Sequence, residues 1–227
     1  LVILPSDQAF DFMLFCQRNP RPCPLLEVVE AGSSEPHQTA PGADLRTDVA
    51  RYRIYEYGEL VDEPEDISDI WQTDMVSFLL GCSFTFEEAL IRSGISMRHY
   101  DQDKNVSMFI TSIQTIPAGA FYGPMVVTMR PIPQEMVVKA VQVTSRFPSV
   151  HGAPIHIGDP AAIGIRDVSA PDMGDPVEIK EGEVPVFWAC GVTPQAVAMD
   201  SKPPLMITHS PGHMFITDLR DEDLSVL

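Results

Sequence analysis

The segment FWACGVTPQ, residues 187–195, predicts a strand that ends in a glycine turn and leads into a helix. The apolar run over residues 184–189 is typical of a buried strand. Thr193 and Pro194 are expected at the N-cap and the first position of the helix. Backbone N–H groups at a helix start favour an anion, so Cys190 or a substrate carboxylate could use this turn. A buried structural cysteine is an equally simple interpretation.

Composition and charge narrow the classes of partner. The chain has 227 residues, of which 44% are hydrophobic, enough for a substantial core. Its 15 Lys and Arg against 32 Asp and Glu give a formal net charge of −17. This acidity argues against nucleic acid and anionic membrane surfaces as partners. A small anionic substrate remains compatible with the sequence, because a local cluster of Arg or His can override the overall charge.

Cysteine usage and the first residues bear on the compartment. The four cysteines are scattered, which favours a reducing, cytoplasmic location over a disulfide framework or a thiolate zinc site. Residues 1–5 do not resemble a signal peptide, and no apolar run approaches the roughly 20 residues of a membrane helix. The chain starts without Met, so we expect the natural N-terminus upstream.

The hydrophobic pattern predicts alternating helices and strands without an internal repeat, which is typical of an α/β fold. We expect a mixed sheet with helices on its faces, in one catalytic unit over 1–227 with two lobes and the site between them. The expected lobe boundaries lie near 115–124 and 196–204. The expected helices cover 6–19, 68–80 and 133–146, with others following 83 and 193; strands are expected at 25–29, 108–114, 125–129 and 204–208, with a hairpin over 52–61.

A second cysteine turn, GCS at residues 81–83, resembles the first. Gly81 is expected to end one helix, and either Ser83 or Thr85 to cap the next, which places Cys82 beside a helix N-terminus, as Cys190 is. The two turns are therefore candidate walls of one site.

Proton-transfer residues gather in turns of the later chain. Histidine titrates near neutral pH, and active sites are often built on turns. The candidate histidines are His151, His156, His209 and His213, and the neighbouring acids are Asp159, Asp172 and Asp175. These acids could orient imidazoles or bind a divalent cation, but turn chemistry explains them equally well. The sequence contains no nucleotide-binding loop and requires no cofactor.

Arg130 stands out because basic residues are scarce. It ends a predicted strand before Pro131, where its guanidinium could bind a carboxylate in a bidentate manner. A structural ion pair with one of the many acids is the alternative.

Several long motifs, in order along the chain, resemble a bacterial hydro-lyase family related to the D-glutamate cyclase domain of mitochondrial enzymes. The motifs are GCSFTFEEAL (81–90), VVTMRP (126–131), RFPSVHGAPIHIGDP (146–160), PDMGD (171–175), PVFWACGVTPQ (185–195) and ITHSPGHMFITDL (207–219). The resemblance covers essentially the whole chain and implies an α/β fold of two lobes. It also implies conversion of D-glutamate, or a related acidic amino acid, to 5-oxoproline with loss of water.

This reaction assigns roles to the candidate residues. The amine needs a base, the departing oxygen needs protons, and the α-carboxylate needs an anchor. Proton transfer is assigned to His151, His156, His209, Cys82, Cys190 and Asp159. Substrate binding is assigned to Arg130, Ser83, Thr193, Gln195 and His213, and a divalent cation, if one binds, to Asp172 and Asp175.

Two other classes of function fit the same residues. Paired cysteines could serve a cofactor-independent amino-acid racemase or epimerase, as acid and base on opposite faces of an α-carbon. A non-catalytic protein that binds carboxylates or lactams would use the same pocket without turnover. A homo-oligomer is compatible with any of the three.

Overall fold

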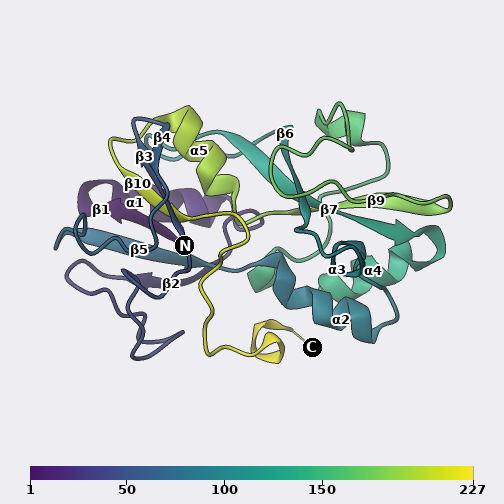
Figure 1. Cartoon of the computed structure of the whole chain (residues 1–227), viewed down its shortest axis with the longest axis horizontal. Helices are drawn as coiled ribbons and strands as arrows, with labels where there is room; N and C mark the ends of the chain where they lie inside the picture. The colour runs from purple at the N-terminus through teal and green to yellow at the C-terminus, as the bar shows by residue number, and fades with distance from the viewer. Residues whose placement is uncertain (227) are drawn as a thin grey trace.

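The computed structural model describes residues 1–226 and shows two antiparallel sheets side by side (Figure 1). The six-stranded sheet has the order β2-β5-β1-β10-β3-β4, and the four-stranded sheet has the order β6-β7-β9-β8. The strands are β1 Val2–Pro5, β2 Leu25–Val29, β3 Tyr52–Glu56, β4 Glu59–Asp62, β5 Met75–Leu80, β6 Ser107–Gln114, β7 Pro124–Pro133, β8 His156–Ile157, β9 Glu183–Ala189 and β10 Met206–His209. The predicted α/β class is confirmed, although these strands pair antiparallel in two sheets instead of one mixed sheet.

Helices flank the two sheets and join them. Helix α1 packs on the six-stranded sheet, whereas α2, α3 and α4 lie beside the four-stranded sheet (Figure 1). Helix α5 contacts β7 of one sheet and β10 of the other. The helices are α1 Ser6–Arg18, α2 Glu87–Arg92, α3 Arg98–Asp101, α4 Val137–Thr144 and α5 Thr193–Ser201. None of these helices has the length and apolar character needed to span a membrane.

The predicted helix over residues 68–80 is wrong, because its second half is strand β5. Met75 and Leu79 pack into one core cluster, while Val76 and Phe78 pack into another on the opposite face of the sheet. A strand buried on both faces reads as a continuous apolar run, which periodicity alone cannot distinguish from a buried helix.

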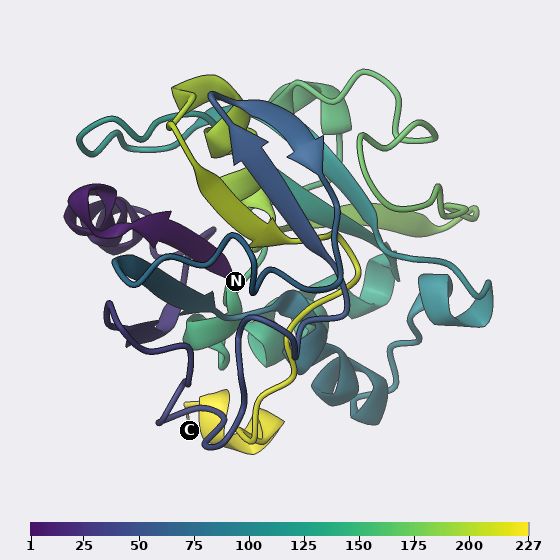
Figure 2. The same ribbon diagram turned by 60° about the vertical axis from the view of Figure 1, so that its left-hand side comes forward.

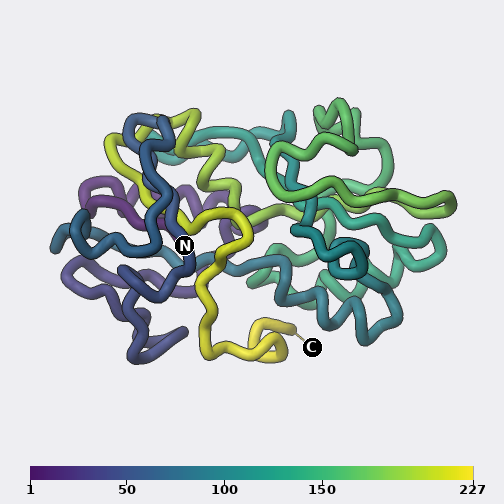
Figure 3. The backbone as a smooth tube through the Cα atoms, in the orientation of Figure 1, coloured from purple at the N-terminus to yellow at the C-terminus, as the bar shows by residue number. Residues whose placement is uncertain are grey.

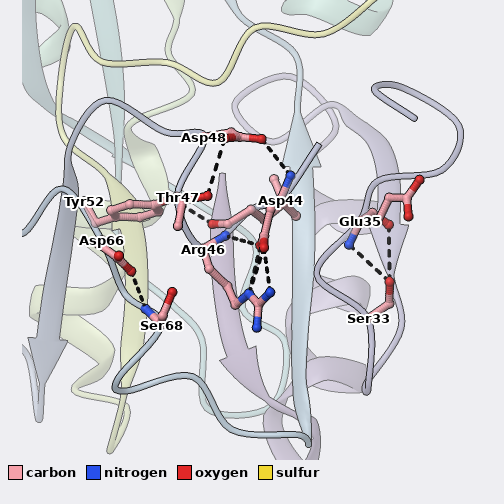
Figure 4. A network of polar contacts seen from close by, with 10 residues as sticks. Ser33, Glu35, Asp44, Arg46, Thr47, Asp48, Tyr52, Asp66 and Ser68 are labelled. Carbon is pink, nitrogen blue, oxygen red and sulfur yellow. Dashed lines mark hydrogen bonds and ion pairs between the residues drawn. The ribbon is translucent and has the colours of Figure 1, made fainter. Parts of the chain in front are cut away.

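Residues 68–74, the first half of the predicted helix, form turns and irregular structure, and an acid just before them holds such a turn (Figure 4). Asp66 accepts a hydrogen bond from the backbone N–H of Ser68 at 2.7 Å. Nearby, Arg46 binds the Asp44 carboxylate, with its Nη2 at 2.6 Å from Oδ2. The acids Asp44 and Asp66 are therefore used in local turn structure.

The path of the chain between the sheets places the cysteine turns at their junction. After β5 the chain leaves the six-stranded sheet, builds the other sheet, and returns through α5 to β10 (Figure 3). Residues 115–123 connect β6 and β7 within one sheet, whereas residues 196–204 span the return from α5 towards β10. The segment after β10 then descends between the two sheets (Figure 2). The division into lobes at 115–124 and 196–204 stays a prediction.

Candidate active site

A pocket lies at the junction of the two sheets, and both cysteine turns line it. The turn after β5 and the turn after β9 form part of its wall, and Gly212, Met214, Phe215 and Thr217 form another part. Its polar lining residues are Cys82, Ser83, Asn105, Thr128, Cys190, His209 and Thr217. The other lining residues are apolar or glycine, and in the described part of the chain no Asp, Glu, Lys or Arg lines the pocket. The pocket therefore favours a small ligand with limited charge.

Glycines occupy the point where the two turns meet. A Cβ atom on Gly81 would lie 2.0 Å from the carbonyl oxygen of Ser149, so no other residue fits there without backbone movement. A Cβ atom on Gly191 would lie 3.3 Å from the carbonyl oxygen of Gly81. The turns from the two sheets thus pack backbone against backbone, which brings the following residues of each turn to one pocket.

Burial keeps both pocket thiols protonated near neutral pH. It raises the pKa of the Cys82 thiol, an effect that the backbone N–H of Phe84 and the charge of Arg130 only partly offset. It also raises the pKa of Cys190 to about 12. Both cysteines are free thiols. They are consequently better suited to donating protons than to acting as resting nucleophiles.

Arg130 lies behind the pocket wall and is fully engaged. Its Nε donates to Glu87 Oε1 at 2.7 Å, and its Nη2 donates to the same oxygen. Nη1 donates to Thr128 Oγ1 at 2.9 Å and Nη2 to Ser83 Oγ at 3.1 Å. Burial raises the pKa of Glu87, but the charge of Arg130 and the contacts with His99 together outweigh burial, so the net pKa is lowered. Arg130 thus forms a structural ion pair with Glu87, the alternative considered from the sequence. Its contacts with the pocket lining are the hydrogen bonds to Ser83 and Thr128.

His151 is buried behind the two turns and does not line the pocket. Its Nδ1 lies 2.7 Å from the carbonyl oxygen of Arg21, which can only accept, so Nδ1 carries the proton. Its Nε2 is buried, has no hydrogen-bond partner among the described residues, and lies 3.8 Å from the Cβ position of Gly191. Burial lowers the pKa of His151 to about 4, so the imidazole is neutral.

His209 is the histidine that lines the pocket. Burial lowers its pKa well below the ordinary value, so its imidazole is neutral at pH 7. Its Nδ1 lies 3.1 Å from the Leu1 nitrogen. Gln195 Nε2 donates to the His209 carbonyl oxygen at 2.8 Å, which fixes the end of β10 against α5. A neutral imidazole at the pocket wall can accept a proton.

Thr193 and Gln195 are used inside the fold. Thr193 Oγ1 lies 2.8 Å from the Cys190 carbonyl oxygen, to which it donates, and accepts from the Val126 N–H at 3.1 Å. The Gln195 side-chain oxygen accepts from Arg53 at 3.2 Å. Neither residue lines the pocket. Their hydrogen bonds hold α5 in place, which is a structural explanation for both.

His156 and Asp159 lie at the other edge of the four-stranded sheet and do not reach the pocket. The Nε2 atom of His156 lies 2.7 Å from the backbone carbonyl oxygen of Asp159. The Asp159 carboxylate accepts from the N–H of Ala161 at 3.0 Å. His156 and Asp159 therefore lie next to each other, but neither joins the thiols of Cys82 and Cys190 in the pocket.

The other turn residues also bind backbone groups. Asp172 accepts from the N–H of Ile110 and Asp175 from the N–H of Asn105, both at 2.8 Å. His213 Nδ1 lies 3.1 Å from the carbonyl oxygen of Pro211, outside the pocket lining. Among the residues that the structure describes, no three His, Cys, Asp or Glu side chains are grouped so that they could hold a metal ion.

Three parts of the site were not predicted from the sequence. Thr128 stands two residues before Arg130 on β7, and the period of a strand would have placed both on one face. Glu87 reads as an ordinary acid in the first turn of a helix. In the segment 212–217 only His213 was assigned to the site, whereas the residues that line the pocket are its neighbours Gly212, Met214, Phe215 and Thr217.

The fold is α/β, with a pocket between two antiparallel sheets. The D-glutamate cyclase family matches residues 76–218, which include both cysteine turns, β7 and the 212–217 segment. The chain belongs to this family.

Relatives match over the full chain. A protein of Geobacillus kaustophilus (strain HTA426), named "Putative hydro-lyase GK2103", is 67% identical over 100% of this chain and 86% of its own length. "Putative hydro-lyase YcsI" of Bacillus subtilis (strain 168) is 63% identical over 100% of this chain and 88% of its own length. A solved structure, a nitrogen repressor-like protein MJ0159 from Methanococcus jannaschii, has a TM-score of 0.45 and 10% identity, covering 99% of this chain and 84% of that one.

Proposed function

We propose that this protein is a hydro-lyase that closes an acidic amino acid, D-glutamate in the simplest case, into 5-oxoproline with loss of water. The observation that carries the proposal is the convergence of Cys82 and Cys190, from different sheets, on one largely apolar pocket. Membership of the D-glutamate cyclase family supports it, as do the hydro-lyase names of the relatives.

The chemistry of the pocket suits a dehydration. Forming the ring brings the amine and the side-chain carboxyl carbon together, so holding the folded conformer supplies much of the rate. An apolar wall excludes bulk water and favours the uncharged form of the carboxyl group that is attacked. Attack on a neutral carboxyl group is easier than attack on a carboxylate, because the carbonyl carbon is more electrophilic.

Proton carriers complete the reaction without an external acid. The substrate ammonium group loses two protons, the new C–N bond forms, and the departing carboxyl oxygen leaves as water with two protons. His209, neutral and at the wall, takes a proton from the amine. Cys82, whose thiol stays protonated, gives one to the departing oxygen and regains it from His209. The other proton lost by nitrogen converts the side-chain carboxylate into the neutral acid before the attack, so both protons leave in the water. Cys190 is the second thiol available for the donation to the departing oxygen.

The direct test is incubation of the protein with D-glutamate and L-glutamate, with and without divalent cations, followed by detection of 5-oxoproline. Wild type is expected to form the product, and Cys82→Ala and His209→Gln are each expected to lose about 100-fold or more of the rate. His156→Gln is the matched control, since His156 lies outside the pocket and should retain the wild-type rate. Absence of product under all four conditions would overturn the proposal.

A racemase or epimerase is the second candidate, because two thiols from different sheets line one pocket. That reaction needs one of them as a thiolate, and burial raises the pKa of both. Deuterium uptake at the α-carbon of glutamate in D2O, without formation of 5-oxoproline, would favour this candidate over the cyclase.

A further inference from the structure

Thr128 and Arg130 occupy the same face of strand β7 at different depths. Side chains two residues apart in a strand point the same way, and here Thr128 lines the pocket while Arg130 is buried beyond it. Ser83, on the turn after β5, is the second pocket residue in contact with the Arg130 guanidinium. The hydroxyl groups of Ser83, which follows a strand of one sheet, and Thr128, on a strand of the other, therefore both accept hydrogen bonds from the buried Arg130 guanidinium.

Both hydroxyl groups keep a proton to donate. Thr128 Oγ1 and Ser83 Oγ each accept a hydrogen bond from Arg130, at 2.9 and 3.1 Å. A hydroxyl that accepts still carries one O–H donor. Neither O–H is given to an acceptor within residues 1–226, although both residues are almost completely buried. A buried donor without an acceptor is costly, so a ligand that accepts from it gains affinity.

The guanidinium is held rigidly in its position. Glu87 binds it on one side, and the rings of Phe86 and Trp188 flank it, with centroids 5.2 and 5.5 Å from its central carbon. Hydrogen bonds from a charged donor polarise the hydroxyl that accepts them, and a low-dielectric surrounding strengthens this effect. The two O–H groups are thus stronger donors than hydroxyls in water.

We propose that Ser83 and Thr128 form a subsite for one carboxylate group, which their hydroxyls bind as donors polarised by Arg130 from behind. The ligand class is a small monoanion, because no charged side chain in the described residues lines the pocket and Glu87 balances the charge of Arg130. In the cyclisation this group is the α-carboxylate, while the apolar remainder of the pocket receives the uncharged carboxyl group. The assignment of substrate rests on the proposed function.

Calorimetric titration tests the subsite with 5-oxo-D-proline and with its amide, which lacks the negative charge. Wild type is expected to bind the acid at least tenfold more tightly than the amide. Ser83→Ala and Thr128→Val should each weaken binding of the acid about tenfold, the effect of one hydrogen bond to a charged group. Binding of the amide should change less, so the preference for the acid falls.

Thr111→Val is the matched control. Thr111 is buried on the neighbouring strand β6, bonds the Met125 carbonyl oxygen at 2.8 Å and does not line the pocket. This variant loses a buried hydroxyl as Thr128→Val does, but it should bind the acid as wild type does. Its thermal midpoint separates loss of stability from loss of the subsite.

The proposal is overturned if both pocket variants bind the acid like wild type, if wild type binds acid and amide equally, or if wild type binds neither. Turnover of glutamate is measured separately on the same proteins. Wild type that binds the acid selectively but makes no 5-oxoproline keeps the subsite and loses the proposed function. Turnover that is normal in both pocket variants keeps the function and loses the subsite.

Discussion

The two cysteine turns are alike in sequence and different in what lies behind them. Each places a cysteine next to a glycine after a buried strand, with a hydroxyl residue at the following helix start. Behind Ser83 lies the buried pair of Glu87 and Arg130, and the Ser83 O–H remains available. The Thr193 hydroxyl, in contrast, lies within hydrogen-bond distance of backbone groups that hold α5.

This difference separates the reactive side of the pocket from its supporting side. The turn after β5 supplies a polarised hydroxyl beside a protonated thiol, whereas the turn after β9 supplies a thiol just before helix α5, which is held by the hydrogen bonds of Thr193 and Gln195. A hydroxyl residue at a helix start is therefore insufficient to indicate a binding role. Whether its O–H is free to bind a ligand depends on contacts with residues that are distant in the chain.

The largest expected effect is loss of the charge pair behind the reactive side. Glu87→Gln leaves Arg130 buried without its counter-charge and should lower the free energy of unfolding by about 3–5 kcal/mol. Glu88→Gln is the control: Glu88 is half exposed, pairs with Arg92 and should change the free energy by less than about 0.5 kcal/mol. Urea denaturation followed by tryptophan fluorescence measures both. Equal changes in the free energy of unfolding would show that the buried ion pair contributes no more to stability than the exposed one.

The next effect concerns His151, which lies behind both turns. Its folded pKa of about 4 is below the ordinary value of 6.5, so between these pH values the unfolded chain binds a proton that the folded chain does not. Stability is therefore expected to fall as pH drops from about 6.5 to 4, by about 3 kcal/mol from this group.

His151→Asn tests this pH dependence. Asparagine tolerates the left-handed backbone at this position, where φ is +83°, and its amide N–H₂ can replace the Nδ1 donor to Arg21. Unfolding free energies at pH 7 and pH 5 should differ less in the variant than in wild type. The remaining slope is expected from His209, whose pKa burial also lowers. An unchanged slope would contradict the burial of a neutral His151.

Glycine substitutions compare the packing of the two turns. Gly81→Ala forces a Cβ against the Ser149 carbonyl oxygen and should cost about 3 kcal/mol or more, because backbone must move. Gly191→Ala meets its nearest atom at 3.3 Å and should cost about 1 kcal/mol. Thermal midpoints of the two variants, measured side by side, rank them. The reverse order would mean that the turn after β9 is the tighter one.

Local sequence patterns predicted where individual helices and strands lie better than they predicted which elements pack together. The strand-turn-helix at 187–195 and the strand at 25–29 follow from short apolar runs bounded by turn residues. Residues 75–80 were assigned to a helix because burial on both faces hides the period of a strand. Class and family could be read from the chain, since ordered motifs extend along its whole length.

The candidate site was harder to predict, because the side chains that meet come from distant segments. Ser83 and Arg130 are 47 residues apart and join through one guanidinium. His156 and His209 look alike as turn histidines, but only His209 lines the pocket. No local pattern distinguishes them. His156 lies outside the pocket because its strand, β8, is at the outer edge of the four-stranded sheet.

The most direct test is the rate of 5-oxoproline formation from D-glutamate by Ser83→Ala and Thr193→Val, expressed as kcat/KM per folded protein. We predict that Ser83→Ala loses about tenfold or more of kcat/KM and also lowers the thermal midpoint, because the buried Arg130 Nη2 loses an acceptor. We predict that Thr193→Val lowers the midpoint and retains the wild-type kcat/KM. Equal losses of kcat/KM in both variants, or a loss confined to Thr193→Val, would contradict the division between a reactive and a supporting turn.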